Sequence, residues 1–102
     1  VNDGKLSIEQ LMNFVCENPV KIFGIQEKGF IKEGFDADFT VVDMNKKIII
    51  ENKKIESKCG WSPFDGFEFK GVPVSTIIAG TIKMRDGKIL GNPKGKPLSF
   101  SK

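Results

Sequence analysis

Helical periodicity dominates the first quarter of the chain. Apolar side chains recur every three or four residues, as on one face of an α-helix, at Ile8, Leu11, Met12 and Val15. Ser7 and Gln10 stand three residues apart at the start of this run, which is the spacing of a capping box. The pattern predicts a helix over about Ile8–Cys16.

A second short helix is expected directly afterwards. Asn18 suits the N-cap, and Pro19 suits the first helical position, where its missing N–H costs no hydrogen bond. Ile22 and Phe23 would face inward, and Gly24 would end the helix. The first quarter is therefore predicted to be a helical pair.

Beyond Gly29 the pattern changes to short β-branched and aromatic runs separated by turn residues. Strands are predicted over Asp38–Asp43, Ile48–Ile50, Thr76–Ile78, Thr81–Arg85 and Lys88–Leu90. Asn52–Lys54 predicts a polar turn, and the Asp86–Gly87 pair is a strong hairpin signal. The last twelve residues are rich in proline and glycine, which favours an extended tail or an edge strand.

Helices followed by strands predict an α+β fold. However, five or so short strands covered by only one helical pair make an unbalanced domain. We therefore expect further structure on the N-terminal side of this chain.

The segment Cys59–Gly71, called the aromatic loop below, has an unusual composition. It holds the only tryptophan, Trp61, and three of the nine phenylalanines within thirteen residues, together with three glycines and a proline. Glycine and proline break regular structure, while the aromatic rings carry more apolar surface than a solvated loop leaves in water. The aromatic loop is expected to pack against other parts of a protein.

Composition limits the classes of function. The chain has 102 residues, a net charge of +3 and scattered lysines, including Lys94, Lys96 and Lys102 in the tail, which is weak support for nucleic-acid binding. It lacks an apolar run of membrane-spanning length and a signal-peptide pattern. Cys16 and Cys59 fit no metal-binding spacing, so free thiols and a cytoplasmic location are expected, although one disulfide stays open.

Histidine and tyrosine are absent from the sequence, which removes the commonest general base and transition-metal ligand. Asp36, Asp38 and Asp43 form a carboxylate cluster that could attract a hard cation. However, no calcium-loop spacing follows, and an aspartate at the start of a strand commonly accepts backbone N–H groups instead. We expect no metal site at these residues.

Two other candidate chemistries are weak. Cys59 lies beside Gly60 and close to Lys58, which could lower its pKa, but no histidine is present to act as its base. The remaining acidic candidates have no spacing that places two of them across a cleft: Asp3, Glu9, Asp65 and Glu68. No catalytic, cofactor-binding or metal-binding residue is assigned in this chain.

Nearly the whole chain resembles the C-terminal end of dihydroorotase, in the amidohydrolase superfamily, and three stretches carry the resemblance. Asn18–Gly24 is similar to that family's last barrel-associated helix, and Gly29–Phe39 to its glycine-punctuated approach to a strand. Both recur in dihydropyrimidinases and allantoinases. The third stretch is Ser62–Gly66, followed by Gly71 and a Pro-Val pair ahead of Thr76–Ile78. This motif is specific to fewer families and resembles dihydroorotase first and allantoinase second.

The resemblance implies a parent enzyme with a (β/α)8 barrel and a composite β-sandwich built from both chain ends. Residues 1–24 would be terminal helices that flank the barrel, and residues 25–102 a small, mostly antiparallel portion of the sandwich with an extended tail. The family's zinc ligands and catalytic aspartate lie upstream of the matched region, so the zinc of the parent would not be bound by this chain. The scaffold would bury Ile8, Leu11, Val15, Phe23, Phe39, Val41, Ile49, Trp61, Phe64, Ile77 and Ile78.

Three hypotheses follow. The first is a non-catalytic C-terminal segment of a zinc-dependent dihydroorotase, which interconverts N-carbamoyl-aspartate and dihydroorotate in pyrimidine biosynthesis. The second is the same segment of an allantoinase or another cyclic amide hydrolase, and the third is a stand-alone, non-catalytic module that pairs with a catalytic subunit. The expected partner is the barrel and N-terminal strands of its own polypeptide, and without them the chain is expected to self-associate. The start at Val1, without methionine, favours a cut or processed piece.

Overall fold

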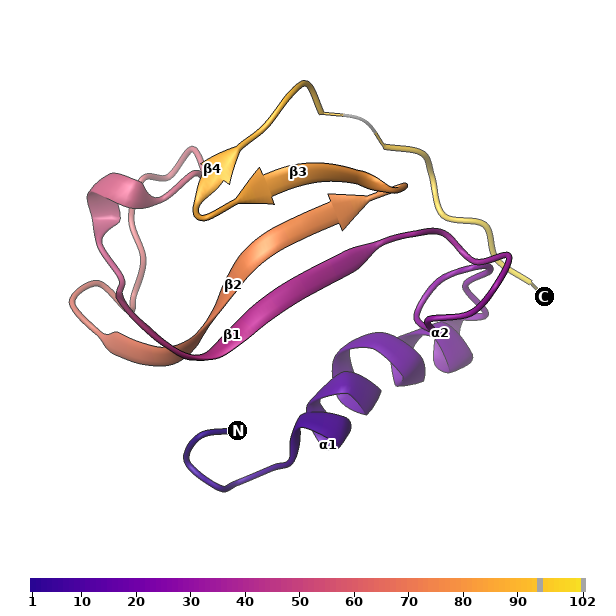
Figure 1. The fold of residues 1–102 in the computed structure, drawn as a ribbon, viewed down its shortest axis with the longest axis horizontal. Helices are drawn as coiled ribbons and strands as arrows, with labels where there is room; N and C mark the ends of the chain where they lie inside the picture. Colours follow the sequence, from indigo (N-terminus) through magenta and orange to yellow (C-terminus); the bar gives the residue numbers. More distant parts are fainter. Residues whose placement is uncertain (94, 102) are drawn as a thin grey trace.

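The computed structural model describes residues 1–93 and 95–101, so Lys94 and Lys102 of the predicted tail lie outside the described residues. One helix with a π-helical turn inside it is followed by a single antiparallel sheet with the strand order β1-β2-β3-β4 (Figure 1). The expected α+β class is confirmed. The sheet forms one layer in the described chain.

The helix begins where the capping box predicts. α1 covers Ile8–Met12, with the Ser7 hydroxyl accepting the Gln10 N–H at 3.1 Å. The Gln10 side-chain oxygen accepts the Ser7 N–H at 2.8 Å in return. These two bonds satisfy backbone donors that the first helical turn leaves free.

The predicted break before Asn18 is wrong. A π-helical turn, η1 over Asn13–Glu17, joins α1 to α2 over Asn18–Phe23, and Asn18 has helical dihedral angles instead of acting as a side-chain cap. Its N–H bonds to the Asn13 carbonyl, one residue further back than in an α-helix. Pro19 offers no N–H to an i−4 carbonyl, and a π-turn accommodates this loss without ending the helix. Gly24 ends α2 with φ +65°, as predicted.

Two predicted strands form one. β1 covers Phe39–Ile49 without a break, although its pairing with β2 shifts between Asp43 and Lys47. In this irregular part the Asp43 carboxylate accepts the N–H groups of Asn45 at 2.9 Å and Lys46 at 3.2 Å. The carboxylate thus holds a bulge inside the strand, where the sequence suggested a gap.

β2 covers Glu68–Ile78 and therefore begins before Val74, where the sequence first becomes strand-like. The last residues of the aromatic loop, including Phe69, belong to this strand. Two tight turns connect β2 to β3 over Thr81–Arg85, and β3 to β4 over Lys88–Ile89. Both central residues have positive φ in Ala79–Gly80 and in Asp86–Gly87, as in the turns that suit two-residue hairpins, so the predicted Asp-Gly hairpin is confirmed.

The described chain does not close around a core. Its accessible surface is 8303 Å², whereas a compact protein of 11.3 kDa exposes about 5,700 Å². Its radius of gyration is 15.5 Å, against about 13 Å for a compact domain of this length. Val72, 7% exposed, is the one apolar residue of the described part that is buried.

Apolar residues expected to be buried in a parent protein are exposed here. Val15, Phe23 and Trp61 are each at least 60% exposed. No residue of α1, η1 or α2 has a Cα atom within 8 Å of a described strand residue. Among the described helices, none has the length and apolar character that crossing a membrane requires.

Candidate functional site

Charged side chains gather where the loop after α2 meets the turn between β2 and β3. The Lys28 ammonium lies 2.9 Å from the Asp36 carboxylate and also bonds to the Asp38 carboxylate. The other Asp38 oxygen accepts the Ala79 N–H at 2.9 Å, and Lys96 lies 3.6 Å from Asp36. Two of the three predicted aspartates therefore meet around a lysine that the sequence patterns did not single out.

The ion cluster of Lys28, Asp36 and Asp38, called the brace below, connects the loop after α2 to the turn between β2 and β3. Hydrogen bonds from Lys28 lower the pKa of Asp38 and that of Asp36, and the Ala79 N–H lowers the pKa of Asp38 further. The same two carboxylates, Asp38 first, raise the pKa of Lys28. All three groups are thus held in their charged forms, which suits an ion pair and not a proton donor or acceptor near neutral pH.

The described residues do not fit a zinc site. Nowhere in residues 1–93 and 95–101 do three or more histidine, cysteine, aspartate or glutamate side chains come together as metal ligands. Asp36 and Asp38 are bonded to Lys28, and Asp43 holds the bulge of β1 instead of joining them. A zinc ion requires three or four converging ligands, mostly imidazole or thiolate, which this set does not supply.

Cys59 is exposed, and like Cys16 it is a free thiol. The Ser57 hydroxyl lies 3.4 Å from its sulfur and lowers the pKa of the thiol, since a hydroxyl can donate to the thiolate. The thiol itself donates to the Trp61 carbonyl at 3.6 Å. A general base to complete a nucleophilic pair is not among these neighbours, so the arrangement offers a polar contact and no catalytic pair.

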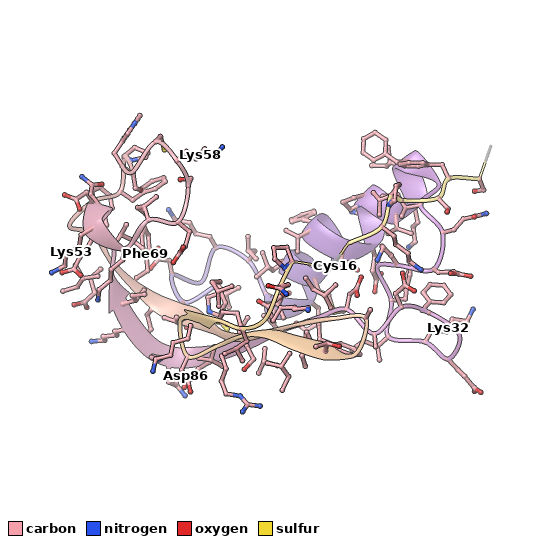
Figure 2. All side chains as sticks on the ribbon, turned by 90° about the horizontal axis from the view of Figure 1, so that it is seen from above. Cys16, Lys32, Lys53, Lys58, Phe69 and Asp86 are labelled. Carbon is pink, nitrogen blue, oxygen red and sulfur yellow. The ribbon has the colours of Figure 1, made fainter. Side chains whose placement is uncertain are left out.

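The aromatic loop is ordered by contacts among its own rings and by hydrogen bonds with Asn52. Phe64 packs edge-to-face on Phe67 and on Phe69, with ring centroids 5.8 and 6.0 Å apart. The Asn52 side-chain oxygen accepts the Ser62 backbone N–H at 2.8 Å, and the Asn52 backbone N–H donates to the Asp65 carboxylate at 2.8 Å. Figure 2 shows this region, marked by Lys53, Lys58 and Phe69, at the opposite end of the molecule from Lys32.

The described chain does not cover the aromatic loop, which was expected to pack against other parts of a protein. Its three phenylalanines are between 40% and 54% exposed despite their mutual contacts. An open depression beside the loop is lined by Ile49–Lys53 and Asp65–Gly66, and its Glu51 carboxylate is paired with Lys54 at 3.1 Å. It is a shallow surface and not an enclosed ligand site.

The predicted absence of an acid–base pair stays a prediction. Asp65 accepts a backbone N–H, and Glu68 lies 3.9 Å from the Lys47 ammonium. These contacts are with the backbone and a cation. What the sequence patterns missed is Lys28, whose spacing of eight and ten residues from two aspartates follows no helical or strand period.

Known proteins resemble this chain over most of its length. The dihydroorotase of Pyrococcus furiosus is 42% identical over 96 residues, which make up 94% of this chain and 23% of that protein. The dihydroorotase of Methanothermobacter thermautotrophicus is 42% identical over 98 residues, 95% of this chain and 23% of that protein. The chain thus spans less than a quarter of the length of these relatives.

A solved structure agrees with these sequence matches. The L-hydantoinase (dihydropyrimidinase) of Arthrobacter aurescens superposes with a TM-score of 0.83 at 36% identity, over 88% of this chain and 20% of that one. The family model described as "Amidohydrolase family" matches residues 1–83. The fold and the sequence therefore agree, and this chain belongs to the amidohydrolase family.

Proposed function

We propose that this chain is the C-terminal, non-catalytic segment of a dihydroorotase, the hydrolase that interconverts N-carbamoyl-aspartate and dihydroorotate in pyrimidine biosynthesis. The observation that carries the proposal is the 42% identity to the Pyrococcus furiosus dihydroorotase across 94% of the chain. The aromatic loop supports it, because Ser62–Gly66 carries the motif that is specific to the fewest families among those that resemble this enzyme.

The role of the segment would be that of a scaffold. Residues 1–24 would flank the barrel of the parent enzyme, and residues 25–102 would contribute a layer of its β-sandwich. The surface that the described chain exposes, about 2,600 Å² more than a compact protein of its mass, supports extensive contact with other parts of a longer polypeptide. The parent's barrel and N-terminal strands are the partner that we assign to it.

The catalytic chemistry would then reside elsewhere in the parent. Zinc in the parent would be held by residues outside this chain, since the carboxylates of Asp36, Asp38 and Asp43 are engaged by Lys28 and by backbone N–H groups. We therefore assign no catalytic, cofactor-binding or metal-binding residue here. Free thiols at Cys16 and Cys59 support a reducing, cytoplasmic location.

A second candidate is the same segment in a hydantoinase-type cyclic amide hydrolase. The superposition on the L-hydantoinase structure, at a TM-score of 0.83, favours it specifically. Dihydroorotate and hydantoins are both rings closed by an amide, so the two candidates share a reaction and differ in substrate.

Assays on the whole polypeptide that carries this segment separate the candidates. We expect hydrolysis of dihydroorotate at a kcat/KM at least about a hundredfold above that for hydantoin. The reverse preference would support the hydantoinase. The C59S and D65N variants should keep kcat within about twofold of the parent's value, because neither residue is assigned to the chemistry. A hundredfold loss of kcat in either variant, with unchanged thermal stability, would contradict the non-catalytic role.

A further inference from the structure

The dipeptide Asp-Gly occurs at three places in this chain, Asp3–Gly4, Asp65–Gly66 and Asp86–Gly87. Glycine has no Cβ atom, so it leaves the peptide nitrogen after the aspartate without steric cover. That nitrogen can attack the aspartate side chain and close a five-membered ring. Because the three sites share this dipeptide, the structure around each decides how fast it reacts in the folded protein.

The fold restrains two of the three sites through hydrogen bonds of the glycine N–H. The Gly66 N–H donates to the Ile50 carbonyl at 2.7 Å, and the Asp65 carboxylate accepts the Asn52 backbone N–H at 2.8 Å. The Gly4 N–H donates to a neighbouring carbonyl, that of Val1, at 2.9 Å. Ring closure at Asp65 requires two hydrogen bonds to break, so we expect this site to be the best protected.

The Asp86–Gly87 turn is restrained less. The Asp86 N–H donates to the Val74 carbonyl at 2.8 Å, but no backbone carbonyl of the described residues accepts the Gly87 N–H. Both turn residues are exposed, and β4, which follows them, pairs with β3 through two residue pairs. Few contacts therefore have to break before the Gly87 nitrogen can reach the Asp86 side chain.

The position of this turn is compatible with the packing proposed for the parent enzyme. Figure 2 shows Asp86 on the side of the sheet that faces away from Cys16 on the helix and from Lys58 in the aromatic loop. A partner that covers the helix and the aromatic loop would thus leave the turn in solvent. The hydrogen bonds that restrain Asp65 lie within this chain, so packing on the parent preserves them.

We propose that Asp86 is the site at which this protein forms isoaspartate, ahead of Asp3 and Asp65. The Gly87 nitrogen forms a bond to Cγ of the protonated Asp86 carboxyl group. The Cγ–O bond breaks, and the hydroxyl leaves with the amide proton as one molecule of water. A second water molecule then opens the ring at either carbonyl, which restores aspartate or leaves the main chain running through Cβ and Cγ.

Isoaspartate at this position would release β4. The β linkage adds one backbone atom to a connection of two residues, whose φ values of +50° and +80° match a tight hairpin. The lengthened connection no longer holds β4 in register with β3. The Leu90 N–H, which donates to the Lys83 carbonyl of β3 at 2.8 Å, reports this change by its hydrogen exchange.

Incubation of the full polypeptide in water enriched in the heavy oxygen isotope tests the assignment. Each ring opening places one heavy oxygen atom at the reacting site, and mass spectrometry of a protease digest locates it. In the folded protein we expect label at Asp86 to accumulate at least about tenfold faster than at Asp65, whereas in urea the two rates should agree within about threefold. D86E keeps the charge and should abolish labelling at this position, because glutamate would have to close a larger ring.

The outcomes are distinct. Equal labelling of Asp86 and Asp65 in the folded protein would overturn the proposal. Labelling of Asp86 in urea alone would also overturn it, since the turn would then be closed or covered in the parent. In the isoaspartate-containing fraction the Leu90 amide should exchange at least about tenfold faster, and the Gly80 amide, which donates to Ala37, should keep its rate. An unchanged Leu90 rate would overturn the release of β4.

Discussion

The sheet and the helix differ in what stabilises them. β1 and β2 pair along most of their 11 residues each, their turns have the dihedral angles of tight hairpins, and Val72 is buried between neighbours. The helix is well capped at both ends, yet its apolar residues, such as Val15 and Phe23, remain exposed. The sheet has its backbone pairing within this chain, although apolar strand residues such as Val41 and Ile49 stay exposed, while the helix has local structure and no Cα atom within 8 Å of a described strand.

This difference shows that local signals and tertiary burial are separate requirements. A helix of this length gains little stability from backbone bonds alone, and most helical stability in proteins comes from packing an apolar face. The helix therefore needs a surface that the described chain does not provide. The proposed barrel of a parent enzyme would supply it.

The sharpest test of the contrast is a pair of valine truncations. V72A removes methyl groups from a buried position and should lower the free energy of unfolding by about 2 kcal/mol. V15A, at an exposed helical position, should change it by less than about 0.5 kcal/mol in this chain alone. Chemical denaturation followed by circular dichroism measures both.

The V72A and V15A variants also test the difference between sheet and helix in the full polypeptide. If the helix packs on the rest of the parent, V15A should cost about 2 kcal/mol there, close to V72A. An unchanged small effect of V15A in the longer protein would mean that the helix is solvated in the parent too.

Asn2 connects the N-terminal segment to the sheet, and its removal should have the next largest effect. Its side-chain amide donates to the Met44 carbonyl at 3.1 Å and to the Lys70 carbonyl at 3.0 Å, across β1 and β2. N2D has the same shape but no donor, so we expect a loss of about 1 kcal/mol in the free energy of unfolding. N13D, on the helix, is the matched substitution. Equal effects of the two variants would mean that charge, and not the bridge, is responsible.

A smaller effect of opposite sign is expected at the turn between β2 and β3. Ala79 has φ +49°, which costs a residue with a side chain more than it costs glycine. A79G should therefore raise the free energy of unfolding by about 0.5 kcal/mol, whereas A37G, where no positive φ is needed, should lower it by a similar amount. Thermal denaturation distinguishes the signs, and a destabilising A79G would show that the turn is not strained.

The signals that predicted structure correctly are short in sequence. The Ser7 and Gln10 capping box, the Gly24 stop and the Asp86–Gly87 turn each involve residues within a few positions of one another. The bulge of β1 was missed because a carboxylate, Asp43, keeps the strand continuous through polar residues that resemble a turn.

Longer-range features could not be found from periodicity. The Ser101 and Gly24 contact joins residues 77 positions apart, and no local pattern encodes it. The brace was missed for the same reason, since Asp36 and Asp38 become neighbours of Lys28 only when the loop folds against the β2–β3 turn. The absence of a metal site in the parent's C-terminal segment stays a prediction from the resemblance.

The brace also gives the sheet end a pH dependence that the helix should not share. Because the folded-state pKa values of Asp36 and Asp38 lie below the ordinary 3.8, their contribution is fully present above that pH and is lost as pH falls through the lowered values. The contribution of Lys28, whose pKa is raised above 10.5, is present below that pH and is lost only in strong alkali. We expect the amide proton shift of Ala79, which donates to Asp38, to titrate with a midpoint below 3.8.

Replacing Lys28 tests whether it lowers the pKa of Asp38, through a small shift in the midpoint of the Ala79 amide titration. K28M removes the cation that lowers both carboxyl pKa values, so the Ala79 midpoint should move upward, toward 3.8. K21M is the matched control, because Lys21 is on α2 and its ammonium lies 5.7 Å from the centre of the Phe30 ring instead of bonding to these carboxylates. An unchanged midpoint in K28M would mean that the Ala79 N–H and the charge of Lys96 hold the Asp38 carboxylate charged without Lys28, and the sheet end would then be independent of Lys28 in the loop that follows the helix.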